Sequence, residues 1–214
     1  MILIETIFFD VDGTLIDATK DIVKAVNHTL GVLGVKPRPA KEIISYIGTG
    51  VRDLVGKSLK KDGPGLTDEG VEIFSEYYMR HAADEAKLYP HVKETLRYFK
   101  DKHKFILTNR FARFADITLK SFDIRKHFEG ILGGDDENCK KPSACILNNM
   151  FQKLNIDRDK AMIVGDMTID VETGHNAGIK TCCVTYGLGK IEEIQSAKPD
   201  YIIDDIIELE RIIR

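Results

Sequence analysis

Residues 2–15 read ILIETIFFDVDGTL, and this stretch decides the fold. The run from Ile2 to Val11 is mostly apolar, is rich in Ile and Phe, and stops at acidic residues and Gly13. A buried strand of a parallel sheet has this pattern. Open parallel sheets bind ligands beyond the carboxyl ends of their strands, so the sequence predicts a functional site at Asp10 and Asp12.

The next part of the chain, from about residue 17 to residue 85, shows helical periodicity only. Apolar residues recur at spacings of three and four between Ile22 and Leu33, and Gly and Pro residues separate this helix from three more. No strand pattern interrupts them. We therefore predict an inserted, all-helical cap domain over residues 17–86.

From Leu88 onward, strand and helix patterns alternate to the end of the chain. Such alternation, with right-handed crossovers, predicts an α/β fold in which helices cover both faces of a parallel sheet. Residues 1–16 and 87–214 are therefore expected to form one core domain. The predicted strands after the first are 104–108, 130–132, 161–164, 181–185 and 201–203.

The composition limits the classes of partner. The chain has 214 residues, 43% of them hydrophobic and 30% charged, with a formal net charge of -3. Lys and Arg are dispersed, so neither a nucleic-acid footprint nor a membrane-binding cluster is predicted. A small molecule is therefore the expected partner, and a monomer or homodimer is expected. The start of the chain lacks the basic segment of a signal peptide, which favours a cytoplasmic protein.

Four cysteines carry no recognisable pattern. Cys139, Cys145, Cys182 and Cys183 show neither Cys-x-x-Cys nor zinc-ligand spacing, and two adjacent cysteines on a strand would point to opposite faces. We expect all four to be reduced thiols.

The predicted strand ends and adjoining loops collect polar side chains: Asp10, Asp12, Thr108, Asn109, Lys141, Asp166 and Asp170. Four carboxylates in one crevice repel one another unless a cation joins them. Because the set offers oxygen ligands without His or Cys, it selects Mg²⁺ over Zn²⁺.

Lys141 and the Thr108 hydroxyl add a positive charge and a donor, which together with the metal would hold a phosphoryl group. With its repulsion from phosphate compensated in this way, Asp10 can act as a nucleophile. Asp12 can then protonate the leaving-group oxygen and later deprotonate the water that hydrolyses the acyl phosphate.

These residues fall into four motifs. Residues 10–15 (DVDGTL), Thr108-Asn109, Lys141-Pro142 and Gly165-Asp166 with Asp170 resemble, in order and separation, the motifs of haloacid dehalogenase-like phosphohydrolases. The resemblance covers nearly the whole chain and implies a Rossmann-like core with a helical cap inserted directly after the first motif.

The resemblance also implies the role of each residue. Asp10 would be nucleophile and metal ligand, and Asp12 would be the acid/base that lends its backbone carbonyl to Mg²⁺. Asp170 would lie in the inner or outer metal shell, although a carboxylate at this place could also cap a helix. The implied phosphate-binding residues are Thr108, Asn109 and Lys141, and the implied metal ligands are Asp10, Asp12, Asp166 and Asp170.

Asp12 also separates reaction types, because haloacid dehalogenases lack this second aspartate and transport ATPases carry lysine there. Ester or anhydride hydrolysis is therefore favoured. The segments Ile47-Gly48-Thr49-Gly50 and Gly133-Gly134-Asp135 and the size of the cap most resemble phosphoglycolate phosphatases. Three alternatives on the same scaffold stay open: a β-phosphoglucomutase-like phosphosugar mutase, a pyrophosphatase and a nucleotidase. The intact motifs argue against a non-catalytic binding module. Two departures from the family pattern, Arg110 and the missing second proline after Lys141, leave the subfamily open.

In the cap, Gly48, Thr49, Gly50 and Arg52 allow two interpretations. They form either a simple connection between helices or a substrate-specificity loop that closes over the site. Tyr77, Tyr78 and Met79, on the last cap helix, are expected to pack within the cap.

Overall fold

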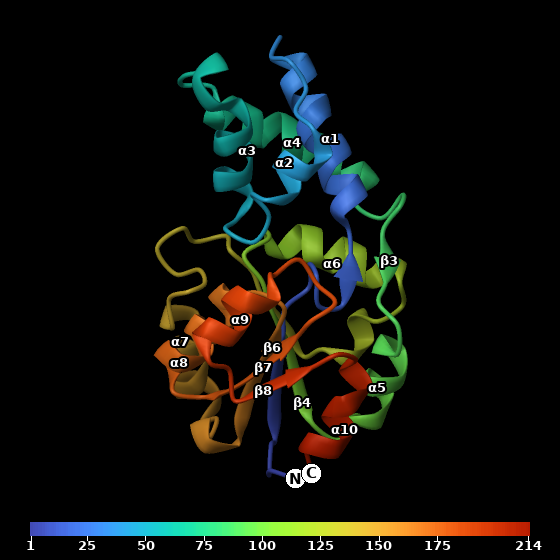
Figure 1. Cartoon of the computed structure of the whole chain (residues 1–214), viewed down its shortest axis with the longest axis vertical. Coiled ribbons are helices and arrows are strands. Elements are labelled where there is room, and N and C mark those ends of the chain that lie inside the picture. The colour runs from blue at the N-terminus through green and yellow to red at the C-terminus, as the bar shows by residue number, and fades with distance from the viewer.

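The computed structural model describes residues 1–214, except for the side chain of Lys61. Its centre is a six-stranded sheet of parallel neighbours in the order β5-β4-β1-β6-β7-β8 (Figure 1). This confirms the predicted parallel sheet, although the first strand is shorter than expected. The strands are β1 (Thr6–Phe9), β4 (His103–Leu107), β5 (Gly130–Leu132), β6 (Ala161–Gly165), β7 (Lys180–Val184) and β8 (Tyr201–Ile203).

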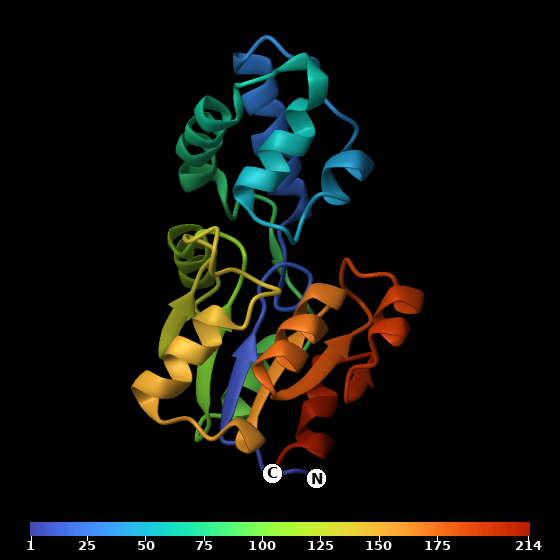
Figure 2. The same cartoon turned by 90° about the vertical axis from the view of Figure 1, so that its left-hand side faces the viewer.

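Helices cover both faces of this sheet, as predicted (Figure 2). Alternation along β1 separates the two layers, because successive side chains of a strand point to opposite faces. Ile7 and Phe9 belong to the cluster that includes residues of α5, α6 and α10, whereas Phe8 packs with residues of α7 and α8. The helices are α5 (Val92–Tyr98), α6 (Ala112–Ser121), α7 (Cys145–Leu154), α8 (Thr168–Ala177), α9 (Ile191–Ala197) and α10 (Leu209–Ile212), with short 3₁₀ turns at Arg125–His127, Arg158–Lys160 and Ile206–Glu208.

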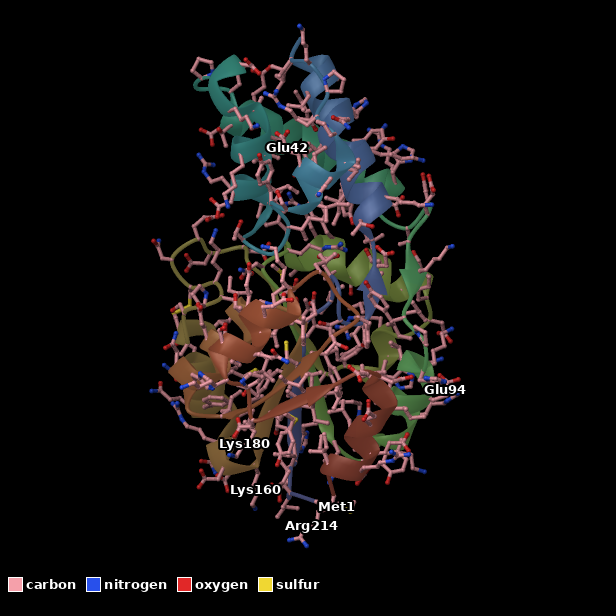
Figure 3. All side chains as sticks on the ribbon, viewed as in Figure 1. Met1, Glu42, Glu94, Lys160, Lys180 and Arg214 are labelled. Atoms are coloured by element: carbon pink, nitrogen blue, oxygen red, sulfur yellow. A yellow bond between two sulfur atoms is a disulfide. The ribbon has the colours of Figure 1, made fainter. Side chains whose placement is uncertain are left out.

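Both chain ends lie at the end of the molecule opposite to Glu42 (Figure 3). Ile2 donates to the carbonyl of Ile212 at 2.7 Å, and Arg214 donates to the carbonyl of Ile2 at 2.9 Å. The first and last segments are thereby tied together below the amino ends of the strands.

The remaining helices form a helical lobe beyond the carboxyl ends of the strands (Figures 1 and 2). Between residues 18 and 86 the described chain is helix and loop, in agreement with the sequence pattern, although the last helix ends at His81 rather than near residue 85. The division into two domains at residues 17 and 86 stays a prediction. The lobe helices are α1 (Thr19–Val32), α2 (Ala40–Ile44), α3 (Val51–Leu59) and α4 (Thr67–His81), with a 3₁₀ turn at Lys60–Asp62.

Two chain segments connect the lobe to the core. They pair as a small antiparallel ladder of β2 (Ile16–Asp17) and β3 (Lys87–Leu88). The buried carboxylate of Asp21, at the start of α1, accepts hydrogen bonds of 2.9–3.1 Å from the backbone N–H groups of Glu85 and Ala86. The incoming and outgoing segments are therefore held side by side.

The expectation of four reduced thiols was wrong for one pair. Cys139 and Cys145 form a disulfide, with their Cα atoms 5.2 Å apart. The chain between them turns back on itself, which brings residues six positions apart within bonding distance, and sequence spacing alone does not reveal such a turn. Cys182 and Cys183 are free and buried, and they join different hydrophobic clusters, as expected for neighbours on a strand.

The lengths and apolarity of the helices also bear on membrane insertion. In the part of the chain that the structure describes, no helix is both long and apolar enough to cross a bilayer.

Candidate active site

The site forms around Asp10, which follows the central strand β1. The backbone N–H of Asp10 donates to the carbonyl of Val164 on β6, at 2.9 Å, so the residue is fixed between neighbouring strands. Its side chain is buried against Lys141, whose Nζ lies 3.0 Å from Asp10 Oδ1 and 2.6 Å from Asp170 Oδ1. Motifs 131 residues apart in the chain therefore meet at one point.

Three carboxylates gather there. Asp10, Asp166 and Asp170 are buried, and each offers an oxygen within 4.8 Å of the others. Burial raises the pKa of Asp10 to about 7; Lys141 opposes this rise, while the charges of Asp170 and Asp12 add to it. Burial and the charges of Asp170 and Asp10 likewise raise the pKa of Asp166. A buried set of oxygen donors with mutual repulsion fits a hard divalent cation such as Mg²⁺.

Asp166 is held rigidly within this cluster. Its Oδ1 accepts from the Thr14 hydroxyl at 2.9 Å, and its Oδ2 accepts from the backbone N–H of Leu188 at 2.7 Å. Gly13 has a φ of +86°, and a Cβ at this position would lie 2.1 Å from Asp166 Oδ2. The glycine after Asp12 is therefore required both by the backbone conformation and by the approach of Asp166.

Asp170 serves two purposes at once. Its Oδ2 accepts from the backbone N–H groups of Asp166 and Met167, at 3.2 and 3.1 Å, at the start of α8. Its Oδ1 contacts Lys141. The helix-capping role and the place beside the metal cluster, which the sequence left as alternatives, are thus compatible.

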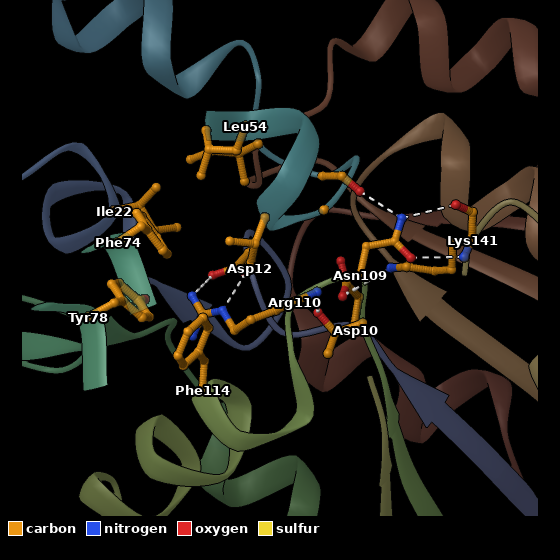
Figure 4. A pocket seen from close by; sticks show the side chains of 15 residues that line it. Asp10, Asp12, Ile22, Leu54, Phe74, Tyr78, Asn109, Arg110, Phe114 and Lys141 are labelled. Carbon is orange, nitrogen blue, oxygen red and sulfur yellow. Dashed lines mark hydrogen bonds and ion pairs between the residues drawn. The ribbon is translucent and has the colours of Figure 1, made fainter. Parts of the chain in front are cut away.

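Asp12 lies apart from the three-carboxylate cluster. Its two oxygens face the guanidinium of Arg110, which donates through Nε to Oδ2 at 3.0 Å and through Nη2 to Oδ1 (Figure 4). Burial raises the pKa of Asp12, and Arg110 opposes this rise. With its carboxylate engaged, Asp12 has its backbone carbonyl left for a metal, which is the contact that the resemblance implies.

The sequence did not single out Arg110 as a site residue. It is buried, and Nη1 donates to the Thr118 hydroxyl at 3.0 Å. Its position directly after Thr108-Asn109 was noted only as a departure from the family pattern. The sequence signal that could have identified Arg110 was its place directly after Thr108-Asn109. An arginine buried there needs an anionic partner.

Thr108 and Asn109 lie beyond the end of β4 and are buried. The Asn109 carboxamide accepts from the Lys141 N–H at 2.8 Å and donates to the carbonyls of Lys141 and Gly48, at 3.0 and 2.9 Å. Both amide hydrogens are thus committed to the backbone. The Asn109 side chain fastens the Lys141 loop and the Gly48 loop together, whereas its contact with phosphate stays a prediction.

The candidate specificity loop is only partly at the site. Gly48 and Gly50 each have a φ of +108° and line the cavity beside Asp10. The Thr49 carbonyl accepts from Lys140 at 2.9 Å. Arg52 instead forms an exposed ion pair with Asp68 and is not among the residues that line the cavity. The positive φ values suit either interpretation, and only the place of the two glycines in the cavity wall fits a specificity loop.

A cavity of about 40 Å³ lies between the lobe and the strand ends. It has room for only a few water molecules, which fits a lobe that lies close against the core. Tyr78, expected to pack only within the cap, belongs to the cavity wall (Figure 4). The lining residues are Asp10, Asp12, Ile22, Ile47, Gly48, Gly50, Val51, Leu54, Phe74, Tyr78, Thr108, Asn109, Arg110, Phe114 and Lys141.

Comparison with known proteins identifies the family. The sequence profile of the haloacid dehalogenase-like hydrolases matches residues 7–184. The chain belongs to this family. As a haloacid dehalogenase-like hydrolase it is an enzyme, and the family predicted from the four motifs is confirmed.

Individual relatives of this hydrolase agree with that assignment. It is 34% identical to a phosphoglycolate phosphatase of Aquifex aeolicus, over 95% of each chain, and 30% identical to one of Vibrio parahaemolyticus, over 98% of this chain and 96% of the relative. Among solved structures, a predicted phosphoglycolate phosphatase from Haemophilus somnus superposes with a TM-score of 0.89 at 26% identity, over 98% of this chain and 97% of that one.

Proposed function

We propose that this hydrolase is a Mg²⁺-dependent phosphatase that transfers the phosphoryl group of a small metabolite to Asp10 and then to water. The observation that carries the proposal is the contact of Lys141 with both Asp10 and Asp170 inside a buried three-carboxylate cluster. The phosphoglycolate phosphatase relatives make 2-phosphoglycolate the first substrate to test.

Each residue has a place in this reaction. When bound by Asp10, Asp166 and Asp170, Mg²⁺ would neutralise charge on the phosphoryl oxygens and on the carboxylates. Lys141 adds a second positive charge at Asp10 and would hold a phosphoryl oxygen, and Thr108 would donate to another. Asp10 attacks phosphorus in line with the departing oxygen, and an aspartyl-phosphate forms as the ester bond breaks.

Asp12 would act as the general acid and the general base of the reaction. Its charge helps to raise the pKa of Asp10, yet its carboxylate is not part of the three-carboxylate cluster. It would donate a proton to the leaving alkoxide and take one from the water that attacks the aspartyl-phosphate. Arg110 holds the carboxylate at this place through two hydrogen bonds.

The cavity favours a phosphatase over a phosphosugar mutase. A mutase of the kind considered above would hold a second phosphate with groups of the lobe, which calls for a cation there. The described lobe residues that line the cavity are Ile22, Ile47, Gly48, Gly50, Val51, Leu54, Phe74 and Tyr78, and none carries a positive charge. A monomer or homodimer in the cytoplasm stays a prediction, and we propose neither nucleic-acid nor membrane partners.

The test is phosphate release from p-nitrophenyl phosphate and from a panel of phosphoglycolate, sugar phosphates, pyrophosphate and nucleotides. We expect turnover with Mg²⁺, its loss in chelator, and its recovery when Mg²⁺ is returned. Asp10→Asn should abolish turnover and trapping by beryllium fluoride, whereas Asp101→Asn, at an exposed aspartate outside the site, should change neither. Equal phosphate release in chelator would exclude the metal, and near-normal turnover by Asp10→Asn would exclude the covalent intermediate.

A further inference from the structure

The cavity wall contains polar hydrogens that form no hydrogen bond with the described residues. The Tyr78 hydroxyl is buried and has no hydrogen-bond partner among the described residues. Leaving a buried hydroxyl unpaired is costly, so such a group usually marks a place where a ligand or water binds. Tyr78 is 1% exposed and is held by Phe74, which stacks on it with ring centroids 5.2 Å apart.

Arg110 beside it is also incompletely paired. A guanidinium has five N–H donors, and Arg110 spends three of them on Asp12 and Thr118. One hydrogen therefore remains on each terminal nitrogen, Nη1 and Nη2. The guanidinium carbon lies 5.3 Å from the centre of the Tyr78 ring, which places these donors close to the tyrosine. Among the described cavity-lining residues, Arg110 is the only cation besides Lys141, which Asp10 and Asp170 already occupy.

The remaining wall is apolar. Ile22, Leu54, Phe74 and Phe114 surround Tyr78 and Arg110 on the side away from Asp10 (Figure 4). A sugar would leave several hydroxyls facing these side chains without partners, which costs free energy for each group. The pocket is better suited to a leaving group that carries one strong hydrogen-bond acceptor. Two hydrogens on neighbouring guanidinium nitrogens can hold both oxygens of a carboxylate, and a tyrosine hydroxyl can add a third hydrogen bond.

We propose that Arg110 and Tyr78 form a subsite for one carboxylate on the leaving group. The subsite selects phosphate esters of short hydroxy acids and discriminates against sugar phosphates and simple alkyl phosphates. It rests on the proposed function, because it names the part of the enzyme that recognises the substrate of that phosphatase.

The test compares two alkyl esters, phosphoglycolate and ethyl phosphate, which differ in the carboxylate. Both release a basic alkoxide, so damage to Asp12 lowers their kcat/KM values together and cancels in the ratio. Tyr78→Phe removes only the hydroxyl and should lower the ratio about 10- to 100-fold, the effect of one hydrogen bond to a charged group. Arg110→Lys should lower it at least as much, because lysine cannot reproduce the guanidinium fork.

A second measurement separates recognition from catalysis. Glycolate should inhibit p-nitrophenyl phosphate turnover competitively, and Tyr78→Phe should weaken this inhibition by the same factor. Because the hydroxyl has no protein partner, Tyr78→Phe should not lower the thermal midpoint of the ligand-free enzyme. Tyr77→Phe and Arg113→Lys are matched controls: Tyr77 stacks on His28 and His81, and Arg113 donates to Ser75, so neither should change the ratio.

The outcomes distinguish the subsite from the proposed function. If wild-type enzyme prefers phosphoglycolate and both site variants keep that preference, the subsite is wrong and the phosphatase assignment stands. If wild-type enzyme hydrolyses ethyl phosphate as well as phosphoglycolate, the subsite and phosphoglycolate as the substrate are both wrong. The enzyme could also hydrolyse an aryl phosphate but neither alkyl ester, and inhibition by glycolate then decides. If glycolate does not inhibit, the subsite is wrong. If glycolate inhibits and Tyr78→Phe weakens that inhibition, the subsite is supported.

Discussion

At the scale of single residues, Asp12 and Asp10 are two aspartates with different surroundings two positions apart. Asp10 faces Lys141 and the acidic cluster, whereas Asp12 faces Arg110. Only Asp10 lies with the other carboxylates that could hold a metal. This separation fits the proposed mechanism, in which one aspartate would act as nucleophile while the other would transfer protons.

The role of Asp12 can be isolated through the leaving group. Asp12→Ala should slow formation of the aspartyl-phosphate far more for phosphoglycolate than for an aryl phosphate, by roughly the 10²–10⁴-fold effect of a positioned acid. An alkoxide needs a proton as it leaves, and a phenolate does not. Single-turnover phosphorylation followed by rapid quench, with both substrates saturating, measures this step apart from later hydrolysis. Equal losses for the two esters would show that Asp12 is not the leaving-group acid.

The sequence could identify Asp12 but not its partner. Motifs in the sequence contain Asp10, Asp12, Lys141 and Asp166, and the residue types of these motifs predict the chemistry of the site. Arg110 has no such motif, and its pairing with Asp12, 98 residues away, depends on β1 and β4 lying side by side. The unpaired Tyr78 hydroxyl is still harder to foresee, because an aromatic residue at helical spacing is usually core packing.

At the scale of elements, the loop between β5 and α7 connects Lys141, beside the acidic cluster, to the lobe. Lys141 points to the carboxylates, while Lys140 donates to the Thr49 carbonyl and also contacts Asp53 at 3.5 Å. The Cys139–Cys145 disulfide encloses both lysines. Periodicity predicted the helix that follows this loop, but a disulfide and a lobe contact are tertiary features that leave no periodic signal.

Breaking the lobe contact should change access to the site. Lys140→Ala removes the hydrogen bond to Thr49 and the contact with Asp53, so the closed arrangement should become less favourable and KM should rise severalfold, in keeping with about 1 kcal/mol for a partly exposed contact. The fold should be unaffected, because the contact lies between the lobe and the core. Steady-state kinetics with phosphoglycolate checks this, with Lys93→Ala, at an exposed helical lysine, as the control. An unchanged KM would mean that Lys140 does not contribute to closure.

The disulfide should stabilise the same loop. Replacing both cysteines, Cys139→Ser with Cys145→Ser, should lower the free energy of unfolding by about 2 kcal/mol, because the unfolded chain is no longer constrained and the closed loop is short. Urea unfolding in the absence of reductant measures the change. Dithiothreitol should destabilise wild-type enzyme to a similar degree and leave the double variant unaffected. Wild-type enzyme that is insensitive to the reductant would contradict a structural disulfide.

At the scale of the whole molecule, a metal bound at the acidic cluster would couple its binding to folding. Asp10, Asp166 and Asp170 come from different motifs and meet only in the folded chain. A ligand that binds the folded state alone stabilises it, by about 2.7 kcal/mol when its concentration is 100 times its dissociation constant. Mg²⁺ should therefore raise the thermal midpoint more than Na⁺ at equal ionic strength. Asp166→Asn should remove the specific Mg²⁺ response, and a response that persists in this variant would place the metal elsewhere.

One buried carboxylate bonds the two segments that connect the lobe to the core. Asp21 is 1% exposed, and its oxygens accept from the N–H groups of Glu85 and Ala86, where the chain returns from the lobe to the core. The Glu85 side chain pairs with Lys20 and Lys24 at the surface, but exposed ion pairs contribute little to stability. Asp21 is therefore the main polar tie between the start of α1 and the returning segment.

Removing this tie should destabilise the fold and loosen the lobe together. Asp21→Ala leaves two backbone N–H groups without their acceptor, so the free energy of unfolding should fall by about 1.5–3 kcal/mol, the range for hydrogen bonds to a charged group. Urea unfolding measures this, with Asp101→Ala as the exposed control. Asp21→Asn retains one carbonyl oxygen, so its loss of stability should be smaller than that of Asp21→Ala. Removal of the Glu85 side chain should lower stability by less than either Asp21 substitution. If Asp21→Ala unfolds at the wild-type urea concentration, the returning segment is held by the β2–β3 ladder and apolar packing instead.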